Sequence, residues 1–431
     1  MTAEPRTPES GATAGPAARP DPEAPSSALE KTRRRESSRG RIIDLIRSRG
    51  PISRVELSET TGLTQATIST LVRTLLTENI VVESGRGEST GGKPRRFLEL
   101  NPASKLGLGA HIGQDYITYI IADLAGRVVA RRRVEGPGDT SPLTVVSRMT
   151  RDIEALIEGS GVDRLSIVGM GIATPGPLDR AAGTVRNAPS LAAWSDFPIR
   201  RALSSTTGLH CEFDNDATAA AIGEYWLGAT EGYVNYASVY MGSGIGSGIV
   251  MDGTIYQGVS SNVGEIGHVT VDARGLPCAC GNIGCLELYA SPEVVVTRAA
   301  EAAARGELSI RFTGVISEDF AAVGAAATDG DATAIQLIQE SAEYVASAVI
   351  SMVNLLDLQL VVLAGSAFAT SGSFYVEVIS EALSRRAMAR AIHPVEVRLS
   401  VNGNDAAALG AATLVLQDRL SPRTLRSVSF A

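Results

Sequence analysis

One histidine and three cysteines lie within 18 residues, in the stretches Gly264-Glu265-Ile266-Gly267-His268 and Cys278-Ala279-Cys280-Gly281-Asn282-Ile283-Gly284-Cys285-Leu286-Glu287. Imidazole and thiolate are ligands that zinc prefers, and four of them complete a tetrahedral site with no open position for a reactive water. We therefore predict one structural zinc ion per chain, held by His268, Cys278, Cys280 and Cys285. The ion would hold the loop 268–287 in one conformation and thereby fix Glu265 and Glu287.

A second polar cluster is Phe213-Asp214-Asn215-Asp216-Ala217, which precedes an alanine-rich stretch. A carboxylate at the end of a strand can accept a proton from a sugar hydroxyl, and an amide beside it can donate and accept. Asp and Asn are also favourable N-caps of helices. Taken alone, the motif favours the cap.

Two glycine-containing segments follow apolar runs. In Met241-Gly242-Ser243-Gly244-Ile245-Gly246-Ser247-Gly248 the glycines would let backbone N–H groups approach a phosphate or another ligand. The same segment is compatible with a glycine-rich hairpin. Thr174-Pro175-Gly176-Pro177 is a rigid turn that carries no functional information by itself.

These residues need an α/β scaffold to position them, and the pattern from residue 101 onward predicts one. The expected strands are 106–112, 117–122, 166–172, 234–240 and 359–364. The expected helices are 143–158, 216–227, 292–305 and 332–356.

The pattern before residue 101 predicts three short helices and two strands. Ile42, Ile43, Leu45 and Ile46 form one apolar stripe, and Gly50-Pro51 ends that helix. Ser53 and Glu56 form a capping box that opens a second helix, and Gly62 suits its left-handed end. Thr64 can cap a third helix with Ile68, Leu71, Val72 and Leu75 on one face. Two helices separated by a short glycine-containing turn are typical of a helix-turn-helix.

The other face of this third helix predicts DNA binding, because short polar side chains and one cation can enter a major groove. The strands 80–82 and 97–100 flank a glycine-rich, basic segment, predicted to be a wing along the phosphate backbone. The predicted DNA contacts are Arg54, Thr64, Gln65, Ala66, Thr67, Ser69, Thr70, Arg73, Lys93, Arg95 and Arg96. A small helical packing module is the alternative.

Charge is distributed unevenly along the chain. Residues 31–100 carry 14 basic and 8 acidic side chains, whereas residues 101–431 carry a net charge of −11. A basic segment joined to an acidic body suits polyanion binding, although a solvated charged face has the same composition. Residues 1–30 contain six prolines and are expected to be a disordered tail. The sequence shows neither a membrane span nor a signal peptide, so a cytoplasmic location is expected.

Together these motifs resemble the ROK family of repressors, uncharacterised reading frames and sugar kinases. The resemblance covers residues 33 to about 415, and its most specific part is the pair of motifs at 264–268 and 278–287. Pro51-Ile52-Ser53-Arg54, Thr61-Gly62-Leu63, Ile68-Ser69 and Gly91-Gly92-Lys93-Pro94 are similar to the winged helix of the family's repressors, which its kinases lack.

The resemblance implies an N-terminal winged helix-turn-helix (31–100) and a two-lobed, actin-like, sugar-kinase-like and ribonuclease H-like body (101–431). It also implies the same four zinc ligands, and sugar contacts from Asn215, Asp216, Glu265, His268 and Glu287, with Asp216 at the position of the kinases' catalytic base.

The chain departs from the family's kinases where they bind nucleotide. Their Asp-x-Gly-Gly-Thr is replaced by His111-Ile112-Gly113-Gln114-Asp115, and a glycine-rich loop by Leu363-Ala364-Gly365-Ser366-Ala367. His111 cannot replace a hard oxygen ligand of magnesium, and Asp115 places negative charge where phosphates would lie. Ser190 stands where family members often have an asparagine, which weakens the case for a sugar ligand.

The expected function is therefore a sugar-responsive transcriptional repressor, not an enzyme, that controls carbohydrate genes and binds operator DNA as a homodimer or homotetramer. The expected effector is a sugar or a sugar phosphate. One alternative is an ATP-dependent sugar kinase that carries a DNA-binding domain. Another is a regulator that senses no sugar.

Overall fold

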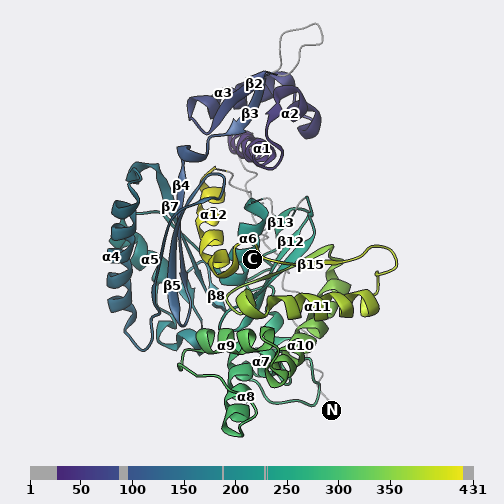
Figure 1. Cartoon of the computed structure of the whole chain (residues 1–431). Helices are drawn as coiled ribbons and strands as arrows, with labels where there is room; N and C mark the ends of the chain where they lie inside the picture. Colours follow the sequence, from purple (N-terminus) through teal and green to yellow (C-terminus); the bar gives the residue numbers. More distant parts are fainter. Residues whose placement is uncertain (1–26, 87–95, 187–188, 228–229, 231, 421–431) are drawn as a thin grey trace, which may run out of the picture.

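The computed structural model describes residues 27–86, 96–186, 189–227, 230 and 232–420 (Figure 1). Its N-terminal domain lies above a larger body and contains the three helices and two strands predicted from the sequence, with the additional short strand β1. A three-stranded sheet of order β1-β3-β2 closes this domain. The elements are α1 (Ser27–Arg49), β1 (Ile52–Ser53), α2 (Arg54–Thr61), α3 (Gln65–Thr77), β2 (Val81–Arg86) and β3 (Arg96–Leu100).

The capping residues predicted from the sequence begin and end α2 and begin α3 in this domain. The Ser53 side chain accepts a hydrogen bond from the Glu56 backbone N–H, and the Glu56 side chain accepts one from the Ser53 N–H, which completes the capping box. Gly62 ends α2 with φ of 70°, and Thr64 caps α3. The predicted apolar face of α3 is buried. Because both helix ends are satisfied locally, the turn between α2 and α3 has a defined geometry.

One expected boundary is wrong. The predicted tail ended at residue 30, whereas α1 begins at Ser27. All six prolines of the tail lie at or before Pro25, and Ser27-Ala28-Leu29-Glu30-Lys31 contains good helix formers. Averaging composition over 1–30 concealed this change.

The body contains two five-stranded sheets with the same plan. In the first lobe the strand order is β10-β7-β4-β5-β6, and in the second it is β13-β12-β11-β14-β15. In each, three consecutive strands form an antiparallel meander, and two later strands add in parallel on the other side of its first strand. The strands are β4 (Leu106–Ile112), β5 (Tyr116–Asp123), β6 (Val128–Glu135), β7 (Ile167–Thr174), β10 (Cys211–Asn215), β11 (Tyr236–Met241), β12 (Ile245–Met251), β13 (Thr254–Ile255), β14 (Leu360–Ala364) and β15 (Glu396–Leu399), with a small hairpin of β8 (Leu178–Asp179) and β9 (Thr184–Val185).

The helices of the body cover these sheets (Figure 1). Helices α4 and α5 belong to the first lobe, and α7 to α11 to the second. Every strand and helix expected in the body is present, with ends within two residues of the expected ones. Their bounds are α4 (Pro142–Ser160), α5 (Ile199–Thr207), α6 (Asp216–Trp226), α7 (Glu287–Ala290), α8 (Pro292–Ala304), α9 (Ile316–Thr328), α10 (Ala332–Leu356), α11 (Phe368–Arg386) and α12 (Ala406–Leu420).

Two helices cross between the lobes. Helix α6 follows the last strand of the first sheet but packs on β11 and β12 of the second, whereas α12 follows the second sheet and packs on β4 and β7 of the first. A Cβ atom on Gly109 or Gly171 would overlap a carbonyl oxygen of α12, so these glycines allow the helix to lie directly on the sheet. The two helices also contact each other and form the centre of the molecule.

No described helix is both long and apolar enough to cross a membrane.

Candidate functional site

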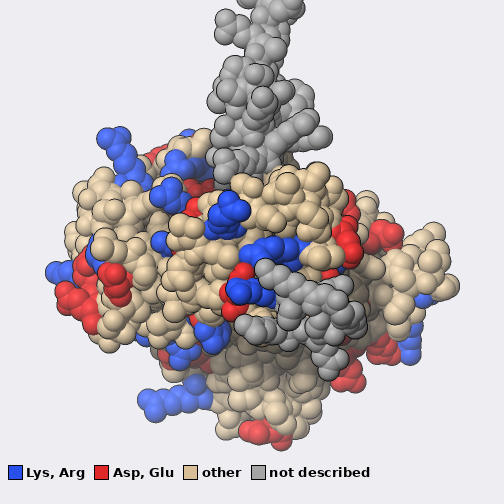
Figure 2. Space-filling view, turned by 90° about the horizontal axis from the view of Figure 1, so that it is seen from above, with Lys and Arg blue, Asp and Glu red and all other residues tan. Residues whose placement is uncertain are grey.

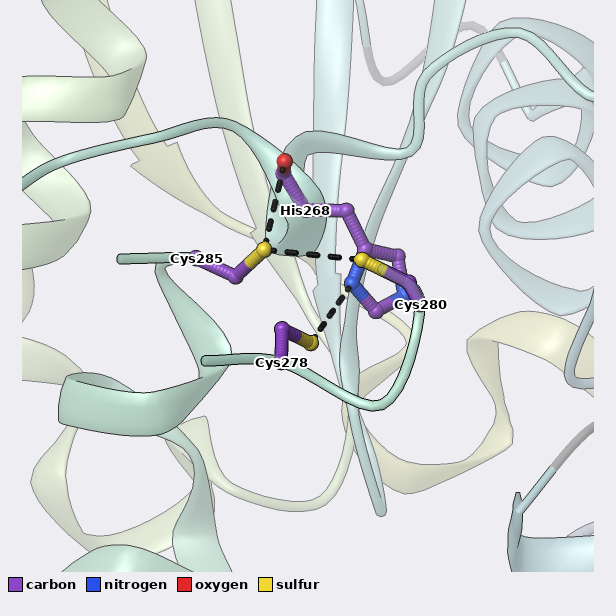
Figure 3. A group of neighbouring side chains, drawn as sticks. All are labelled: His268, Cys278, Cys280 and Cys285. Carbon is purple, nitrogen blue, oxygen red and sulfur yellow. Dashed lines mark hydrogen bonds between the residues drawn. The ribbon is translucent and has the colours of Figure 1, made fainter. Parts of the chain in front are cut away.

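The four predicted metal ligands lie together (Figure 3). Their ligand atoms all lie within 4.8 Å of one another. Cys278 Sγ is 3.7 Å from His268 Nδ1, and Cys280 Sγ is 3.7 Å from Cys285 Sγ. A tetrahedral ion with bonds of about 2.3 Å to sulfur and about 2.0 Å to nitrogen would separate its ligand atoms by about 3.5–3.8 Å. The donor set and its spacing therefore fit a metal of the zinc type, and both contacts are too long for a covalent bond.

His268 connects this metal centre to the carboxylates. Its Nδ1 faces the cysteines, while its Nε2 lies 3.9 Å from Glu287 Oε2. Glu287 is the first residue of α7, and its Oε1 accepts a hydrogen bond of 2.7 Å from the backbone N–H of Ile245. The structure thus places Glu287 between the metal loop and the glycine-rich β11–β12 turn.

Two of the predicted sugar-contacting residues, Asn215 and Glu265, lie beside the turn that contains Gly176. A Cβ atom on Gly176 would lie 3.1 Å from Asn215 Nδ2 and 3.2 Å from Glu265 Oε1. Asn215 is the N-cap of α6, and its Oδ1 accepts from the Ala217 N–H at 2.8 Å. The cap interpretation is therefore correct for Asn215 Oδ1, while its amide nitrogen points toward Gly176 and Glu265.

Glu265 is the carboxyl group of this cluster that is most affected by its surroundings. Burial, together with the negative charges of Asp216 and Glu287, raises the pKa of Glu265 to about 7. A carboxyl group with such a pKa exists near neutral pH as both donor and acceptor of hydrogen bonds. The cluster can therefore match hydroxyl groups, which also donate and accept.

Asp214 lies behind the cluster, at the end of β10. Burial raises the pKa of Asp214 to about 6, against the opposing effect of Arg180, whose Nη2 lies 3.3 Å from Asp214 Oδ2. The sequence motif named Asp214 without assigning it a role, and the structure places it in the interior.

Asp115 and Tyr116 of the first lobe contact the start of α9 in the second lobe. Asp115 Oδ2 accepts a hydrogen bond of 3.0 Å from the Ser317 N–H at the start of α9, and the Tyr116 hydroxyl is bonded to Glu318. Val315 precedes α9 and offers no side-chain acceptor, so Asp115 satisfies an N–H of this helix from the other lobe. A small pocket of about 50 Å³ lies between His111, Gly242 and Ser366.

His111 is a site residue whose contact the sequence did not predict. Its Nε2 lies 3.7 Å from Asp216 Oδ2, and its ring meets Tyr240 edge-on. The sequence showed only that His111 is a poor magnesium ligand. Its proximity to Asp216 depends on the pairing of β4 with β7 and of β7 with β10, which the sequence does not specify.

The predicted nucleic-acid interface lies on the exposed surface of the N-terminal domain. Figure 2 looks onto this domain and shows Lys and Arg side chains over the middle of the face, with acidic side chains beside them. Helix α3 exposes Gln65, Ala66, Thr67, Thr70 and Arg73, and its N-cap Thr64 is exposed as well. Ser69 is half-buried, and Lys93 and Arg95 lie outside the described residues.

Two predicted DNA contacts are engaged with an acidic side chain. Arg54 Nη2 lies 2.9 Å from Glu83 Oε1, and Arg96 bonds to the other oxygen of the same carboxylate. The hydrogen bond from Arg96, more than that from Arg54, lowers the pKa of Glu83. These ion pairs connect the first residue of α2 to β2 and to the first residue of β3.

Comparisons with known proteins agree with this arrangement. The model of the ROK family matches residues 107–418. A putative xylose repressor from a Caldicellulosiruptor species is 30% identical over 383 residues, which span 88% of this chain and 95% of the relative. That alignment is longer than the stretch 107–431, so it extends into the N-terminal domain.

Two solved structures match different lengths of the chain. A ROK family transcriptional regulator, a homologue of the E. coli MLC protein, superposes with a TM-score of 0.73 at 25% identity and covers 90% of this chain and 98% of its own. A ROK family glucokinase from Streptomyces griseus, in complex with glucose and AMPPNP, has a TM-score of 0.64 at 26% identity and covers 72% and 99%. Together with the two-lobed fold, the cysteine-rich loop and the convergent polar cluster, these matches show that the chain belongs to the ROK family.

Proposed function

We propose that this protein is a DNA-binding transcriptional repressor whose body binds a small sugar. The observation that carries the proposal is that one chain joins two parts. One is a basic N-terminal domain with an exposed and capped helix α3, and the other is a body in which Glu265 lies near Asn215, Asp216 and Glu287, with Glu287 near His268. The relatives named as repressors support this proposal, because their similarity spans both parts.

In the proposed DNA complex, α3 enters the major groove and the segment between β2 and β3 follows the phosphate backbone. Residues on the exposed face of α3 contact base edges and phosphates, with Arg73 as the cation. Arg54 and Arg96 position the wing through Glu83 and reach phosphates from there. Two copies of the chain bind the two halves of an operator.

The effector that best fits this polar cluster is an uncharged sugar. Asp216 and Glu287 lie close enough to Glu265 for their charges to raise its pKa, and Asp115 adds another carboxylate in the first lobe. A sugar phosphate would add its negative charge to these carboxylates, which is unfavourable without a compensating cation. Because the relative is named a xylose repressor, D-xylose is the first sugar to test.

Structural zinc completes the site. His268, Cys278, Cys280 and Cys285 would hold it, and it supplies a rigid crosslink in the loop that carries Glu265 and Glu287. With Nδ1 of His268 on the metal, Nε2 stays directed toward Glu287.

We propose that the body does not phosphorylate its sugar. Two features favour a kinase, namely Asp216, which the family resemblance puts at the position of the catalytic base, and the glycine-rich segment 242–248. The space at the nucleotide end is about 50 Å³ and is crossed by the hydrogen bond from Ser317 to Asp115, whereas pockets for small molecules typically measure about 300–1,000 Å³. A coupled assay for ADP over a panel of sugars is expected to show no turnover.

The direct test is genomic. Purified full-length protein is incubated with fragmented genomic DNA, and the bound fragments are sequenced. The proposal predicts a small set of discrete sites beside carbohydrate genes, and thermal shift against D-xylose, D-glucose and N-acetylglucosamine is expected to reveal one stabilising sugar. Uniform recovery of all fragments would exclude a specific repressor.

A further inference from the structure

Helix α6 begins at the polar cluster of Asn215, Asp216 and Glu265 and ends beside the N-terminal domain (Figure 1). It begins with Asn215 as N-cap and Asp216 as first residue. It ends at Trp226, whose ring belongs to the same apolar cluster as Ile43 and Ile46 of α1. Eleven residues at about 1.5 Å each make α6 about 16 Å long. Helix α6 thus runs from the polar cluster of the body to the apolar core of the N-terminal domain.

Arg47 of α1 is hydrogen-bonded to the C-terminal end of α6. Its Nη1 donates to the carbonyl oxygens of Tyr225, at 3.0 Å, and of Trp226. Its guanidinium carbon lies 5.0 Å and 4.9 Å from the centroids of these two rings. The Arg47 side chain is only 4% exposed, so the contact is shielded from water. A cation at this position also interacts favourably with the dipole of α6.

The middle of α6, from Ala217 to Gly223, carries small side chains except at Ile222. A Cβ atom on Gly248 of β12 or Gly410 of α12 would overlap a carbonyl oxygen of α6, so the helix lies against backbone on two sides. Such smooth contacts allow a helix to shift by about 1–2 Å, the range of helix movements in regulatory proteins.

We propose that α6 transmits the state of the polar cluster to the DNA-binding domain and that Arg47 is the residue through which it does so. This inference rests on the proposed function. A sugar that bonds to Asn215 and Asp216 displaces the N-terminus of α6. The helix moves as a rigid unit, and its last carbonyl groups carry Arg47 and α1 with them. The orientation of α3 relative to the body then changes.

The test compares Arg47 with a neighbour on the same helix. Arg47→Met keeps the apolar stem but removes the donors, and Arg47→Lys keeps the charge but cannot reproduce the planar contact with two carbonyls and two rings. Arg49→Met is the matched control, because Arg49 is exposed in the last turn of α1. Each full-length variant is titrated with operator DNA, with and without saturating D-xylose, and D-glucose forms a second arm. Sugar affinity is also measured by calorimetry without DNA.

We expect the sugar to change operator affinity by at least about fivefold in the wild type and in Arg49→Met, the lower end of typical couplings. In Arg47→Met the ratio of operator affinities with and without sugar falls toward one. The sugar affinity measured without DNA is unchanged. Arg47→Lys retains part of the sugar effect on operator affinity. It replaces Arg47→Met in the comparison if the methionine variant fails to fold.

The outcomes distinguish a residue that couples sugar binding to DNA binding from one that only stabilises the contact between α1 and α6. If Arg47 only holds the domains together, both Arg47 variants lose thermal stability or operator affinity but keep the wild-type ratio, which overturns the proposal. A wild-type ratio of one with every sugar instead contradicts the proposed function itself, before any variant is compared.

Discussion

His268 faces two sites with one imidazole ring. Its Nδ1 is 3.7 Å from a cysteine of the metal loop, and its Nε2 is 3.9 Å from Glu287. A metal bound at Nδ1 fixes the plane of the ring and with it the direction of Nε2. At the scale of single residues, the proposed metal centre and the proposed sugar site therefore share His268.

Replacing Cys280 tests the metal centre. Cys280→Ser removes one of four ligands, so we expect loss of the bound zinc and an unstable or unfolded protein, because the metal's binding energy contributes to folding. Elemental analysis of purified protein measures the zinc content. Cys211→Ser is the control, since Cys211 lies buried in the first lobe away from this loop. An unchanged zinc content in Cys280→Ser would contradict the ligand assignment.

Glu265 gives the protein a predictable pH dependence. Its pKa is raised from 4.5 to about 7 in the folded state. The folded protein therefore holds this proton more tightly than the unfolded chain does. The stability that this provides is fully present below about pH 4.5 and is lost as the pH rises through about 7.

The variant Glu265→Gln, which has no proton to lose, isolates this contribution. We expect Glu265→Gln to gain up to about 3 kcal/mol of unfolding free energy relative to the wild type between pH 5 and pH 8, at about 1.36 kcal/mol per pKa unit. Urea unfolding at the two pH values, with zinc present throughout, measures the difference. Parallel pH profiles for the two proteins would show that Glu265 has an ordinary pKa.

Among the elements, α3 carries the prediction that concerns DNA. Arg73 lies on its exposed face, whereas Ile68, Leu71, Val72 and Leu75 form its buried face. Arg73→Ala should weaken operator binding by about 1–3 kcal/mol and reduce the salt dependence of binding by about one phosphate contact. Fluorescence anisotropy at several salt concentrations measures both. Arg151→Ala, an exposed change on α4 of the body, should have no effect. Equal affinities for the two variants would remove Arg73 from the interface.

The start of α9 carries a second prediction, because it is capped from the other lobe. Asp115→Ala should lower the free energy of unfolding by about 0.5–2 kcal/mol, the usual cost of a lost N-cap. Asp115→Asn should retain most of the wild-type free energy of unfolding, since an amide oxygen also accepts a hydrogen bond from the Ser317 N–H. Asp139→Ala, an exposed acidic change nearby, is the control. Urea midpoints for the three variants check the order, and equal midpoints for Asp115→Ala and Asp139→Ala would contradict it.

Local signals in the sequence predicted individual elements well. The capping box at Ser53, the left-handed Gly62 and the apolar spacing of α3 are each defined within a few residues. The sequence did not predict β6, whose surface is largely polar, or the two-residue strand β1. Their pairing with β5 and β3 is decided by tertiary contacts, which outweigh local preference.

The site was predictable in its residues and not in its geometry. The spacing of His268 and the cysteines named the metal ligands. The proximity of His111 to Asp216, and the capping of α9 by Asp115, arise between segments about 100 and 200 residues apart. Such contacts depend on the order of the strands and on the packing of two lobes, which neither composition nor periodicity specifies.

At the scale of the whole molecule, three apolar regions are connected through two central helices. The cores of the two lobes lie on either side of α6 and α12. The core of the N-terminal domain includes Trp226 at the end of α6 and Leu416 and Leu420 of α12. Helices α6 and α12 therefore connect the packing of the two lobes to that of the N-terminal domain.

The measurement that tests the central claim most directly is operator affinity as a function of sugar. Wild-type protein and Asp216→Asn are titrated onto an operator fragment with and without the sugar found by thermal shift. We predict that the sugar changes wild-type affinity by at least about fivefold, whereas Asp216→Asn binds the operator equally well and does not respond. Operator binding that is the same with and without every sugar tested, in the wild type as in the variant, would contradict the account.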